Sequence, residues 1–424
     1  MGAEPRLLEG IRVIDAASFI AGPVATTAMA DFGADVVKLE PPGGDTYRVR
    51  NAGYPPSPYN FPWIVDNRNK RGVAIDLRTV DGRRLLHRLV ARADVFVTNV
   101  PLDGRGRLGV RWEDLAPLNP RLIYGSITAY GEEGEEASRP GFDSTALWAR
   151  TGLMDLVRPS ADAPPARSLP GMGDHPTGMA LFGAIMAALY QRERTGRGAM
   201  VSTSLLANGL WLNAIAAQGI LCGARTVVRP PREAAVDALG NLYRTRDNRW
   251  FLIALTPDGR RWQHFTAVIG HPELFADPRF ATPPARRDNV RALIAILDAV
   301  FAERDWAEWR RLLEAAGIAF GVVGTVDEIP HDPQMRASGA LVPLEDPRAG
   351  ATLTVSSPLH IHGQAKVPAA MAPELGEHTV EVLREAGLDQ AEIDRLLRAG
   401  VVVQAKEPGR GQNCTGVGGI VPLA

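Results

Sequence analysis

The chain has 424 residues, and because single hydrophobic cores seldom grow past about 250–300 residues, we expect two domains. Hydrophobic residues make up 45% and charged residues 22%, which is typical of a folded globular protein and excludes disorder, collagen or a coiled coil as the main architecture. The formal net charge of −1 excludes a whole-protein basic field for nucleic acid.

The first 130 residues alternate short apolar stretches of strand character with helical stretches. This order predicts βαβ units and a parallel sheet, and therefore an α/β fold. The predicted strands cover residues 11–14, 36–39, 73–77, 95–97 and 122–124, and the predicted helices cover 24–32 and 85–90.

The middle of the chain begins with a surface connection and ends in a unit of different composition. Residues 132–173 are rich in Gly, Pro and acidic residues, and we expect a helix within them at 145–153. Later elements are predicted as follows: helices at 176–192, 205–218, 261–269, 290–302, 306–316, 376–387 and 390–399, and strands at 200–204 and 250–255. A basic, Pro-containing stretch at 223–235 predicts a linker.

Asp174 is the main candidate for chemistry, in the motif GMGDHPTG at residues 171–178, just before an apolar helix. One interpretation is an N-cap, because Asp caps helices well. The other is a nucleophile, since the helix dipole and backbone donors would keep the carboxylate ionised and able to attack an activated carbonyl. No pair between Asp174 and His175 is expected, because neighbouring side chains on a turn diverge.

Three loops at predicted strand ends form candidates for binding a phosphate or an oxyanion. Residues 21–23 (Ala-Gly-Pro) follow the first strand and open a helix with Pro23 at its first position, although such a turn is also common without function. Arg107 lies in a Gly-rich basic turn at 103–109, and Arg78 follows the third strand. Arg grips phosphate in a planar fork, while the alternative is a solvated loop charge.

Other classes of chemistry lack a pattern in the sequence. The eight histidines and two cysteines show no metal-ligand spacing, so we predict no metal. The loop after the first strand has no G-x-G-x-x-G, so the dinucleotide fingerprint is not met there, and no G-x-S-x-G motif occurs. Apolar runs stay below the roughly 18 residues that a membrane span needs. With two cysteines far apart and no apolar signal core, a cytoplasmic protein is expected.

Several segments, in the expected order over residues 7–402, resemble the signature blocks of family III CoA-transferases, the CaiB/BaiF family. They are LLEGIRVIDAASFIAGPVATTAMADFGADVVKLEPPGGD, NRNKRGVAIDLRT, ADVFVTNV, LNPRLIYGSITAYG, RPGFD, GDHPTGMALFGAIMAALYQRERTGRG and LGEHTVEVLREAGL. The resemblance implies a large Rossmann-like domain made from both ends of the chain, a small α/β domain in the middle, and an interlocked homodimer. It divides the chain into residues 1–222 (large domain, N-terminal part), 223–239 (linker), 240–329 (small domain), 330–403 (return linker and C-terminal part) and 404–424 (loose tail).

The resemblance also implies the reaction and its residues. The family nucleophile falls on Asp174, which would carry CoA from an acyl-CoA donor to a carboxylic acid acceptor through an aspartyl anhydride and an aspartyl-CoA thioester. CoA and acyl-CoA would be substrates, with no nucleic acid and no membrane as partner. The implied CoA contacts fall on Ile75, Leu77, Arg78, Asn99, Val100, Pro101, Arg107 and Phe142 (within the loop 140–143), and the thioester would lie near Ile20 and Ala21.

The sequence departs from family members in ways that bear on the substrate. Ile20 replaces the Gln of formyl-CoA transferase, and the glycine-rich lid loop is not found at 240–260, so a more apolar acyl group than oxalate or formate is expected. The F-R-P-G turn is replaced at 100–103, and Glu40 is followed by prolines where some relatives have a basic residue. An α-methylacyl-CoA racemase would need a His in the block where Phe142 stands, and a non-catalytic CoA-binding homologue is the third alternative.

Overall fold

The computed structural model describes residues 6–49, 56–225, 230–255 and 259–405. Their contacts form two compact units: unit 1 takes the described residues of 1–147, 169–212 and 336–424, and unit 2 those of 148–168 and 213–335. The domain boundaries given above stay a prediction. Part of the expected linker (226–229) and nearly all of the expected tail (406–424) lie outside the described residues.

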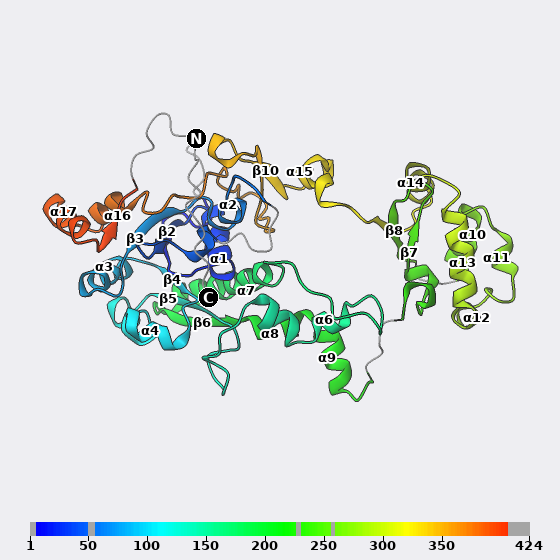
Figure 1. Cartoon of the computed structure of the whole chain (residues 1–424), viewed down its shortest axis with the longest axis horizontal. Helices are drawn as coiled ribbons and strands as arrows, with labels where there is room; N and C mark the ends of the chain where they lie inside the picture. The colour runs from blue at the N-terminus through cyan, green and yellow to red at the C-terminus, as the bar shows by residue number, and fades with distance from the viewer. Residues whose placement is uncertain (1–5, 50–55, 226–229, 256–258, 406–424) are drawn as a thin grey trace, which may run out of the picture. The chain divides into compact units, whose positions relative to one another are not determined.

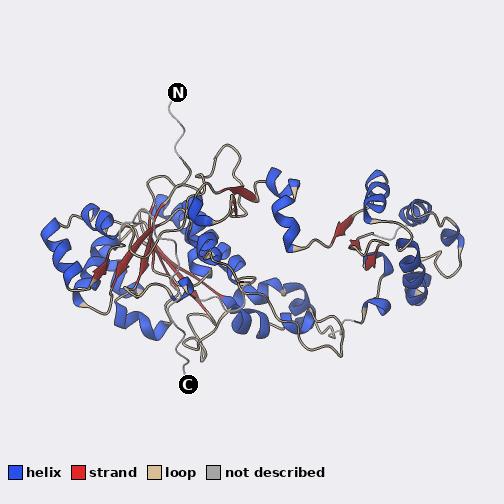
Figure 2. Cartoon of the chain, turned by 45° about the horizontal axis from the view of Figure 1, so that its top comes forward, coloured by secondary structure: helices blue, strands red, loops and turns tan. Residues whose placement is uncertain are grey.

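Unit 1 is built on a seven-stranded sheet of strand order β12-β3-β2-β1-β4-β5-β6 (Figures 1 and 2). Every pair is parallel except β12 with β3, which is antiparallel. This arrangement confirms the predicted α/β fold with a parallel sheet. The strands are β1 (Arg12–Asp15), β2 (Asp35–Glu40), β3 (Arg71–Ile75), β4 (Val95–Thr98), β5 (Ile123–Thr128), β6 (Ala199–Ser204) and β12 (Val402–Val403).

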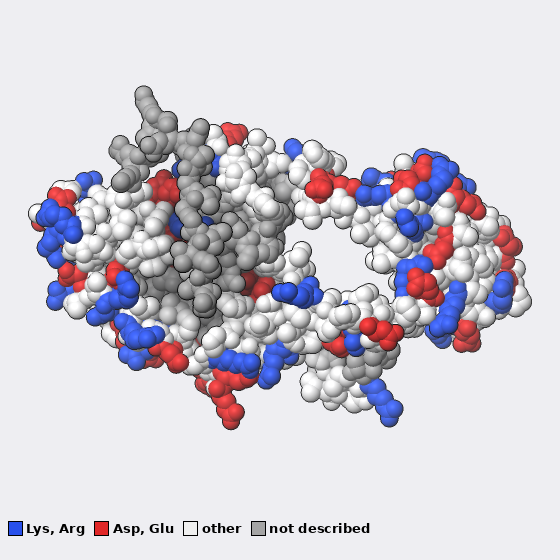
Figure 3. Space-filling view, viewed as in Figure 1, with Lys and Arg blue, Asp and Glu red and all other residues white. Residues whose placement is uncertain are grey.

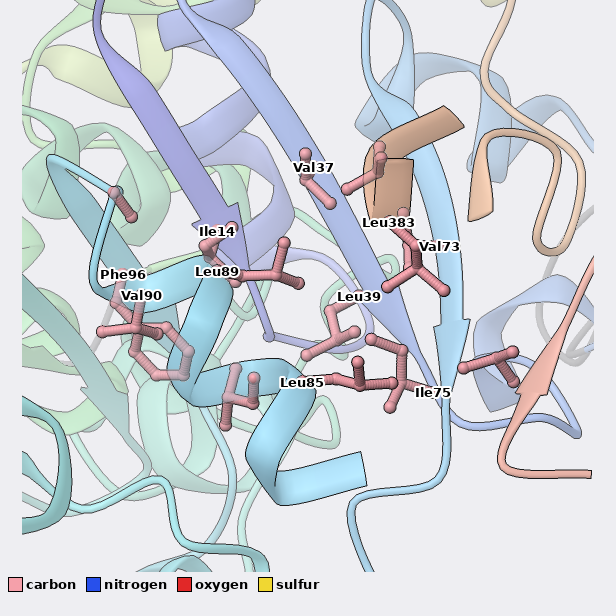
Figure 4. Packing of buried hydrophobic residues seen from close by; sticks show 14 of the residues in the cluster. Ile14, Val37, Leu39, Val73, Ile75, Leu85, Leu89, Val90, Phe96 and Leu383 are labelled. Atoms are coloured by element: carbon pink, nitrogen blue, oxygen red, sulfur yellow. The ribbon is translucent and has the colours of Figure 1, made fainter. Parts of the chain in front are cut away.

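Both faces of the sheet are covered, and all four residues of the central strand β4 are therefore buried. On one face, α3 (Val80–Val90) directs Leu85 and Leu89 onto the strands (Figure 4). On the other face, α1 (Ala21–Asp31) and α7 (Asp174–Thr195) contribute a second core that includes Met29 and Leu181. The two cores hold the carboxyl ends of β1 to β5 at one edge, where α/β proteins bind ligands.

The order of strands changes direction at β1, whose two neighbours are β2 and β4. The other α-helices of unit 1 are α2 (Phe61–Asn67), α4 (Leu102–Leu108), α5 (Trp112–Leu115), α8 (Leu205–Leu212), α16 (Thr379–Glu385) and α17 (Gln390–Arg398). A π-helix spans Asp143–Ala149. A hairpin of β10 (Leu341–Pro343) and β11 (Leu353–Val355) follows α15 (Pro333–Ala337).

Unit 2 has its own core around an antiparallel sheet of order β7-β8-β9. Trp262 and Trp309 are fully buried there. Its α-helices and strands are α6 (Leu153–Leu156), α9 (Ala214–Leu221), β7 (Leu242–Arg244), β8 (Trp250–Ile253), α10 (Gly259–Val268), α11 (Glu273–Ala276), α12 (Pro283–Asp288), α13 (Val290–Phe301), α14 (Trp306–Ala315) and β9 (Phe320–Val322). A 3-10 helix spans Val326–His331.

Three local predictions were wrong. The segment 103–109, expected as a turn, lies in helix α4, which ends at the left-handed Gly109. Helix α1 already begins at Ala21, so Pro23 is its third residue rather than its first. The expected helix at 205–218 is interrupted at Asn213, whose side chain donates to the carbonyl of Thr151.

Candidate active site

The loop between β1 and α1 is strained and anchored at the switch point of the sheet. Phe19 has a φ of 61°, which costs a non-glycine residue roughly 1–3 kcal/mol, and so its surroundings must enforce this conformation. Asn99, directly after β4, accepts from the backbone N–H of Ser18 at 2.8 Å and donates to its carbonyl at 2.7 Å. The next residues, Ile20 and Ala21, are buried.

Two buried lysines donate hydrogen bonds to the backbone of this loop and of the first turn of α1. Lys38 donates to the carbonyl of Ala17, and Lys70 donates to the carbonyl of Pro23 at 2.9 Å. Both ammonium groups face the fully buried Asp15, Lys70 at 2.8 Å and Lys38 at 3.8 Å. Burial, opposed by the Asp15 charge, lowers the pKa of Lys70 to about 8.

The carboxylate of Asp15 is the anion that these lysines share. It also accepts from Thr26 at 2.7 Å and from the backbone N–H of Ala17 at 3.1 Å. Although burial opposes it, the charges of Lys38 and Lys70 lower the pKa of Asp15 below its usual value. The charged cluster of Asp15, Lys38 and Lys70 therefore fixes the backbone on both sides of Ile20 and Ala21.

Asp174 is the first residue of α7 and lies beside the loop just described. The N-cap position belongs to Gly173, so the interpretation of Asp174 as an N-cap was wrong. Asp174 is half-buried, and within the described part of the chain its carboxylate has no hydrogen bond and no ion pair. A half-buried carboxylate that its own protein leaves unpaired is a candidate for chemistry.

The electrostatic setting of Asp174 differs from the expected one. Burial raises the pKa of Asp174 to about 7, with further increases from the charges of Asp143 and Asp66, while His175 lowers it. Desolvation and two nearby acids thus oppose the helix dipole, which was expected to keep this carboxylate ionised.

His175 and Asp66 form a pair that the sequence did not predict. Nε2 of His175 lies 3.1 Å from Oδ1 of Asp66, a buried residue of α2, and Nδ1 lies 2.9 Å from the carbonyl oxygen of Gly171. The hydroxyl of Tyr47 donates to the other oxygen of Asp66 at 3.1 Å. The pair joins segments more than 100 residues apart, which no local pattern reveals.

Two aromatic side chains, those of Phe19 and Phe142, lie near the loop that precedes α7. Phe142 is half exposed, and its ring meets that of Phe19 edge-on with centroids 5.7 Å apart. The adjacent Asp143 accepts from the backbone N–H of Gly171 at 3.0 Å and so fixes the loop before Asp174. A Cβ placed on Gly171 would lie 3.6 Å from Cδ1 of Ile20, so Ile20, Phe19 and the Asp174 loop are neighbours.

The predicted CoA contacts after β3 differ in how far their side chains are exposed. Ile75 is buried in the core, so its side chain is unavailable to a ligand and only its backbone could serve. Leu77 packs against the same core but is only partly buried. Arg78 is exposed, but it holds Asp76 in a bidentate pair at 2.8 and 2.9 Å.

The predicted contacts after β4 lie at the start and the end of α4. Asn99 is tied to Ser18, the carbonyl of Val100 accepts from Arg105, and Pro101 is the N-cap residue. Arg107 is exposed in the last turn, with no ion pair among the described residues.

Arg83 connects the two groups of predicted contacts. It donates to the carbonyls of Leu77 and Arg78 at 3.1 and 3.0 Å, and its Cδ would lie 3.0 Å from a Cβ on Gly109. The end of α4, which carries Arg107, is therefore next to the loop of Arg78. Arg105, which the sequence analysis passed over, is buried and bonds Ser126 and Glu132 instead.

Comparison with known proteins gives the class of this fold and site. Residues 8–379 match the family described as CoA-transferase family III, and the chain belongs to that family. The (R)-2-hydroxy-4-methylpentanoate CoA-transferase of Clostridioides difficile is 31% identical over 93% of this chain and 99% of its own. The succinyl-CoA:glutarate CoA-transferase of Mus musculus is 32% identical over 94% and 90%, respectively.

A solved structure agrees with this assignment. A CaiB/BaiF family protein from Brucella suis superposes with a TM-score of 0.80 at 30% identity, covering 90% of this chain and all of that one. The prediction of an acyl-CoA:carboxylate CoA-transferase is thereby confirmed at the level of the family, with CoA and acyl-CoA as its substrates.

The surface carries both signs of charge. Lys and Arg side chains are interspersed with Asp and Glu over the face shown in Figure 3, in keeping with the net charge of −1. In the part of the chain that the structure describes, no helix is long and apolar enough to cross a membrane.

Proposed function

We propose that this protein transfers CoA from an acyl-CoA donor to a carboxylic acid through covalent intermediates on Asp174. The observation that carries the proposal is the setting of that carboxylate, which is half-buried, begins a helix and has no hydrogen bond from the described residues. A polar partner would block attack, whereas an unpaired oxygen beside an anchored loop is free to reach a bound thioester.

In the first half of the proposed reaction, a carboxylate oxygen of Asp174 attacks the thioester carbon of the donor. The C–S bond breaks, CoA leaves as thiolate, and an acyl-aspartyl anhydride remains. The thiolate then attacks the aspartyl carbonyl carbon and displaces the donor acid, which leaves Asp174 as its CoA thioester. An anhydride keeps the acyl group activated, whereas attack by water would waste it.

The second half repeats these steps with the acceptor acid. The acceptor carboxylate attacks the aspartyl thioester, giving a new anhydride and free thiolate. The thiolate attacks the acceptor carbonyl, forming the new acyl-CoA and restoring the Asp174 carboxylate. Backbone N–H groups near the start of α1 and α7 would stabilise the tetrahedral oxyanions, because helix N-termini present unpaired donors.

The surroundings of Asp174 favour an apolar acyl group. Phe19 and Phe142 provide hydrophobic surface beside the Asp174 loop. Ile20 is buried next to them, where formyl-CoA transferase has Gln. The two relatives named above act on acids of different character, one branched and one dicarboxylic, so the family alone does not select the substrate.

Racemisation is the weaker alternative on structural grounds. Phe142 cannot accept a proton, and His175 is not a replacement base, since both of its ring nitrogens are already bonded to Gly171 and Asp66. CoA binding without catalysis leaves the unpaired Asp174 carboxylate unexplained.

We further propose that the protein acts as the interlocked homodimer typical of its family, in the cytoplasm. Support comes from exposed apolar side chains concentrated within residues 210–221, because exposed apolar patches mark interaction sites. They are Leu210, Trp211, Leu212, Ile215, Ile220 and Leu221, with exposed fractions between 50% and 93%.

An acyl exchange assay tests the proposed function. Purified protein is given an acyl-CoA and a series of carboxylic acids, and new acyl-CoA species are read by mass spectrometry. Asp174→Ala should abolish exchange while the circular dichroism spectrum and the oligomeric state stay unchanged. Near-full turnover in this variant, or deuterium entering the α-carbon without acyl exchange, would overturn the assignment.

A further inference from the structure

The protonation of the His175 ring follows from its two partners. The carbonyl oxygen of Gly171, 2.9 Å from Nδ1, only accepts hydrogen bonds, and the Asp66 carboxylate, 3.1 Å from Nε2, accepts as well. Both ring nitrogens must therefore donate, which makes the ring an imidazolium. In agreement, the Asp66 charge and these bonds raise the pKa of His175 to about 9, against the opposing effect of burial.

The imidazolium is held in place although it reaches the surface. Its side chain is 48% exposed, yet it is fixed at both nitrogens, and its main partner Asp66 is buried and braced by the hydroxyl of Tyr47. A Cβ on Gly171 would lie 3.1 Å from Nδ1 of His175, so the backbone of the loop before α7 also packs against the ring.

Apart from the His175 ring, the charges that act on Asp174 are negative. Asp143, from the segment before α6, and Asp66, from α2, both disfavour a charged Asp174, while His175 favours it. Lys70 also faces Asp66 but is committed to Asp15, Pro23 and Asn67. His175 is thus the cation that offsets the acids beside the proposed nucleophile.

We propose that His175 is a positioning residue: an imidazolium fixed by Asp66 and the Gly171 carbonyl, whose charge favours the ionised form of Asp174 that attacks. The inference rests on the proposed role of Asp174. It also explains why a surface-reaching His has a buried carboxylate partner. If His175 were neutral, Asp66 would act on Asp174 as an uncompensated negative charge.

The pH dependence of kcat/KM distinguishes this role from a merely structural one. In His175→Gln, the amide can still donate to Asp66 but carries no charge, so the acid limb of the profile should move up by about one pH unit or more. Activity should then fall at least tenfold at pH 6 and recover toward the native rate above pH 9. In Asp66→Asn/His175→Gln, both opposite charges are gone, and the limb should return toward its native position.

Matched controls make each outcome decisive. His271→Gln removes an exposed His paired with Glu273 in unit 2 and should leave the profile unchanged. Thermal melting of each variant reports whether it folds. An equal loss of rate at every pH, or an acid limb that stays in place in folded His175→Gln, would overturn the inference. If Asp174→Ala itself retains turnover, the proposed function fails first, and the two failures are distinguishable.

Discussion

A Cβ atom added to Gly178 would lie 2.5 Å from the carbonyl oxygen of Ala21 and 2.8 Å from Cβ of Val24. Only a glycine at this position therefore lets the N-terminal end of α7 approach the first turn of α1 this closely. Because Asp174 lies one turn before Gly178, this contact sets its position relative to Ile20 and Ala21.

Widening this contact should impair catalysis. Gly178→Val forces backbone to move, and overpacking of this kind typically costs about 1–3 kcal/mol of stability. We expect a lower melting temperature and a loss of kcat larger than the change in KM, because Asp174 shifts away from the thioester. Gly183→Ala, on the same helix with nothing within 4 Å of the added carbon, should retain full activity. Equal activity in both variants would contradict the argument.

The buried charge cluster should be a large contributor to folding. Asp15→Asn leaves Lys38 and Lys70 buried without their shared anion, and breaking such a pair typically costs about 3–5 kcal/mol. Denaturant unfolding monitored by fluorescence measures this loss. Glu314→Gln removes an exposed pair with Arg310 and should change stability by less than about 1 kcal/mol. Similar losses in the two variants would show that Asp15 is not the shared anchor.

Activity should depend on the ionisation of Asp174. The charged form attacks, and the pKa of about 7 is above the usual value because burial disfavours that form. Below pH 7, kcat/KM for the acyl-CoA should therefore fall about tenfold per pH unit, and it should level off above pH 7. Stopped assays from pH 5 to 8.5 give the profile. An acid limb of kcat/KM near pH 4 would show that burial and the nearby acids do not raise the pKa of Asp174.

The same raised pKa has a consequence for stability. The folded state favours protonated Asp174, so its stabilising effect is complete below the unfolded value of 3.8 and is lost as the pH rises through 7. Asp174→Asn should accordingly melt at a higher temperature than the native protein at pH 8, with a smaller difference at pH 5. A lower melting temperature at pH 8 would contradict this sign.

Arg107 and Arg78 should differ in their contribution to CoA binding. Arg107 is exposed without a described partner, whereas Arg78 already holds Asp76, and its release would cost that pair. Arg107→Ala should weaken binding of CoA more than of dephospho-CoA if it contacts the 3′-phosphate, while Arg78→Ala should have a smaller effect. Calorimetric titration of both ligands gives the comparison, and equal losses for the two ligands would exclude a phosphate contact by Arg107.

Much of the fold was accessible from the sequence because its signals are local. Strands such as Val95–Thr98 are continuous apolar runs, and the apolar spacing of Leu85, Leu86 and Leu89 marks one helix face. The first turn of α7 could also be located, since Gly and Pro punctuate it. The helical state of 102–108 was missed because its two interior glycines disfavour a helix, while burial of Arg105 against Ser126 compensates.

The electrostatics of the candidate site could not be predicted in the same way. Asp66 and His175 are separated by 109 positions, and Lys70 meets Asp15 across 55 positions. Such contacts follow from the strand order and not from any pattern along the chain. The raised pKa of Asp174 has the same origin, because it depends on acids that come from α2 and from the segment at 143.

The most direct test is to locate the covalent intermediate. Trypsin should release residues 168–192 as one peptide in which Asp174 is the only carboxylic side chain. After brief incubation with an accepted acyl-CoA and rapid acid quench, we predict that mass spectrometry finds a CoA or acyl adduct on this peptide, absent in Asp174→Ala. An active protein whose adduct lies on a different peptide would contradict the central claim.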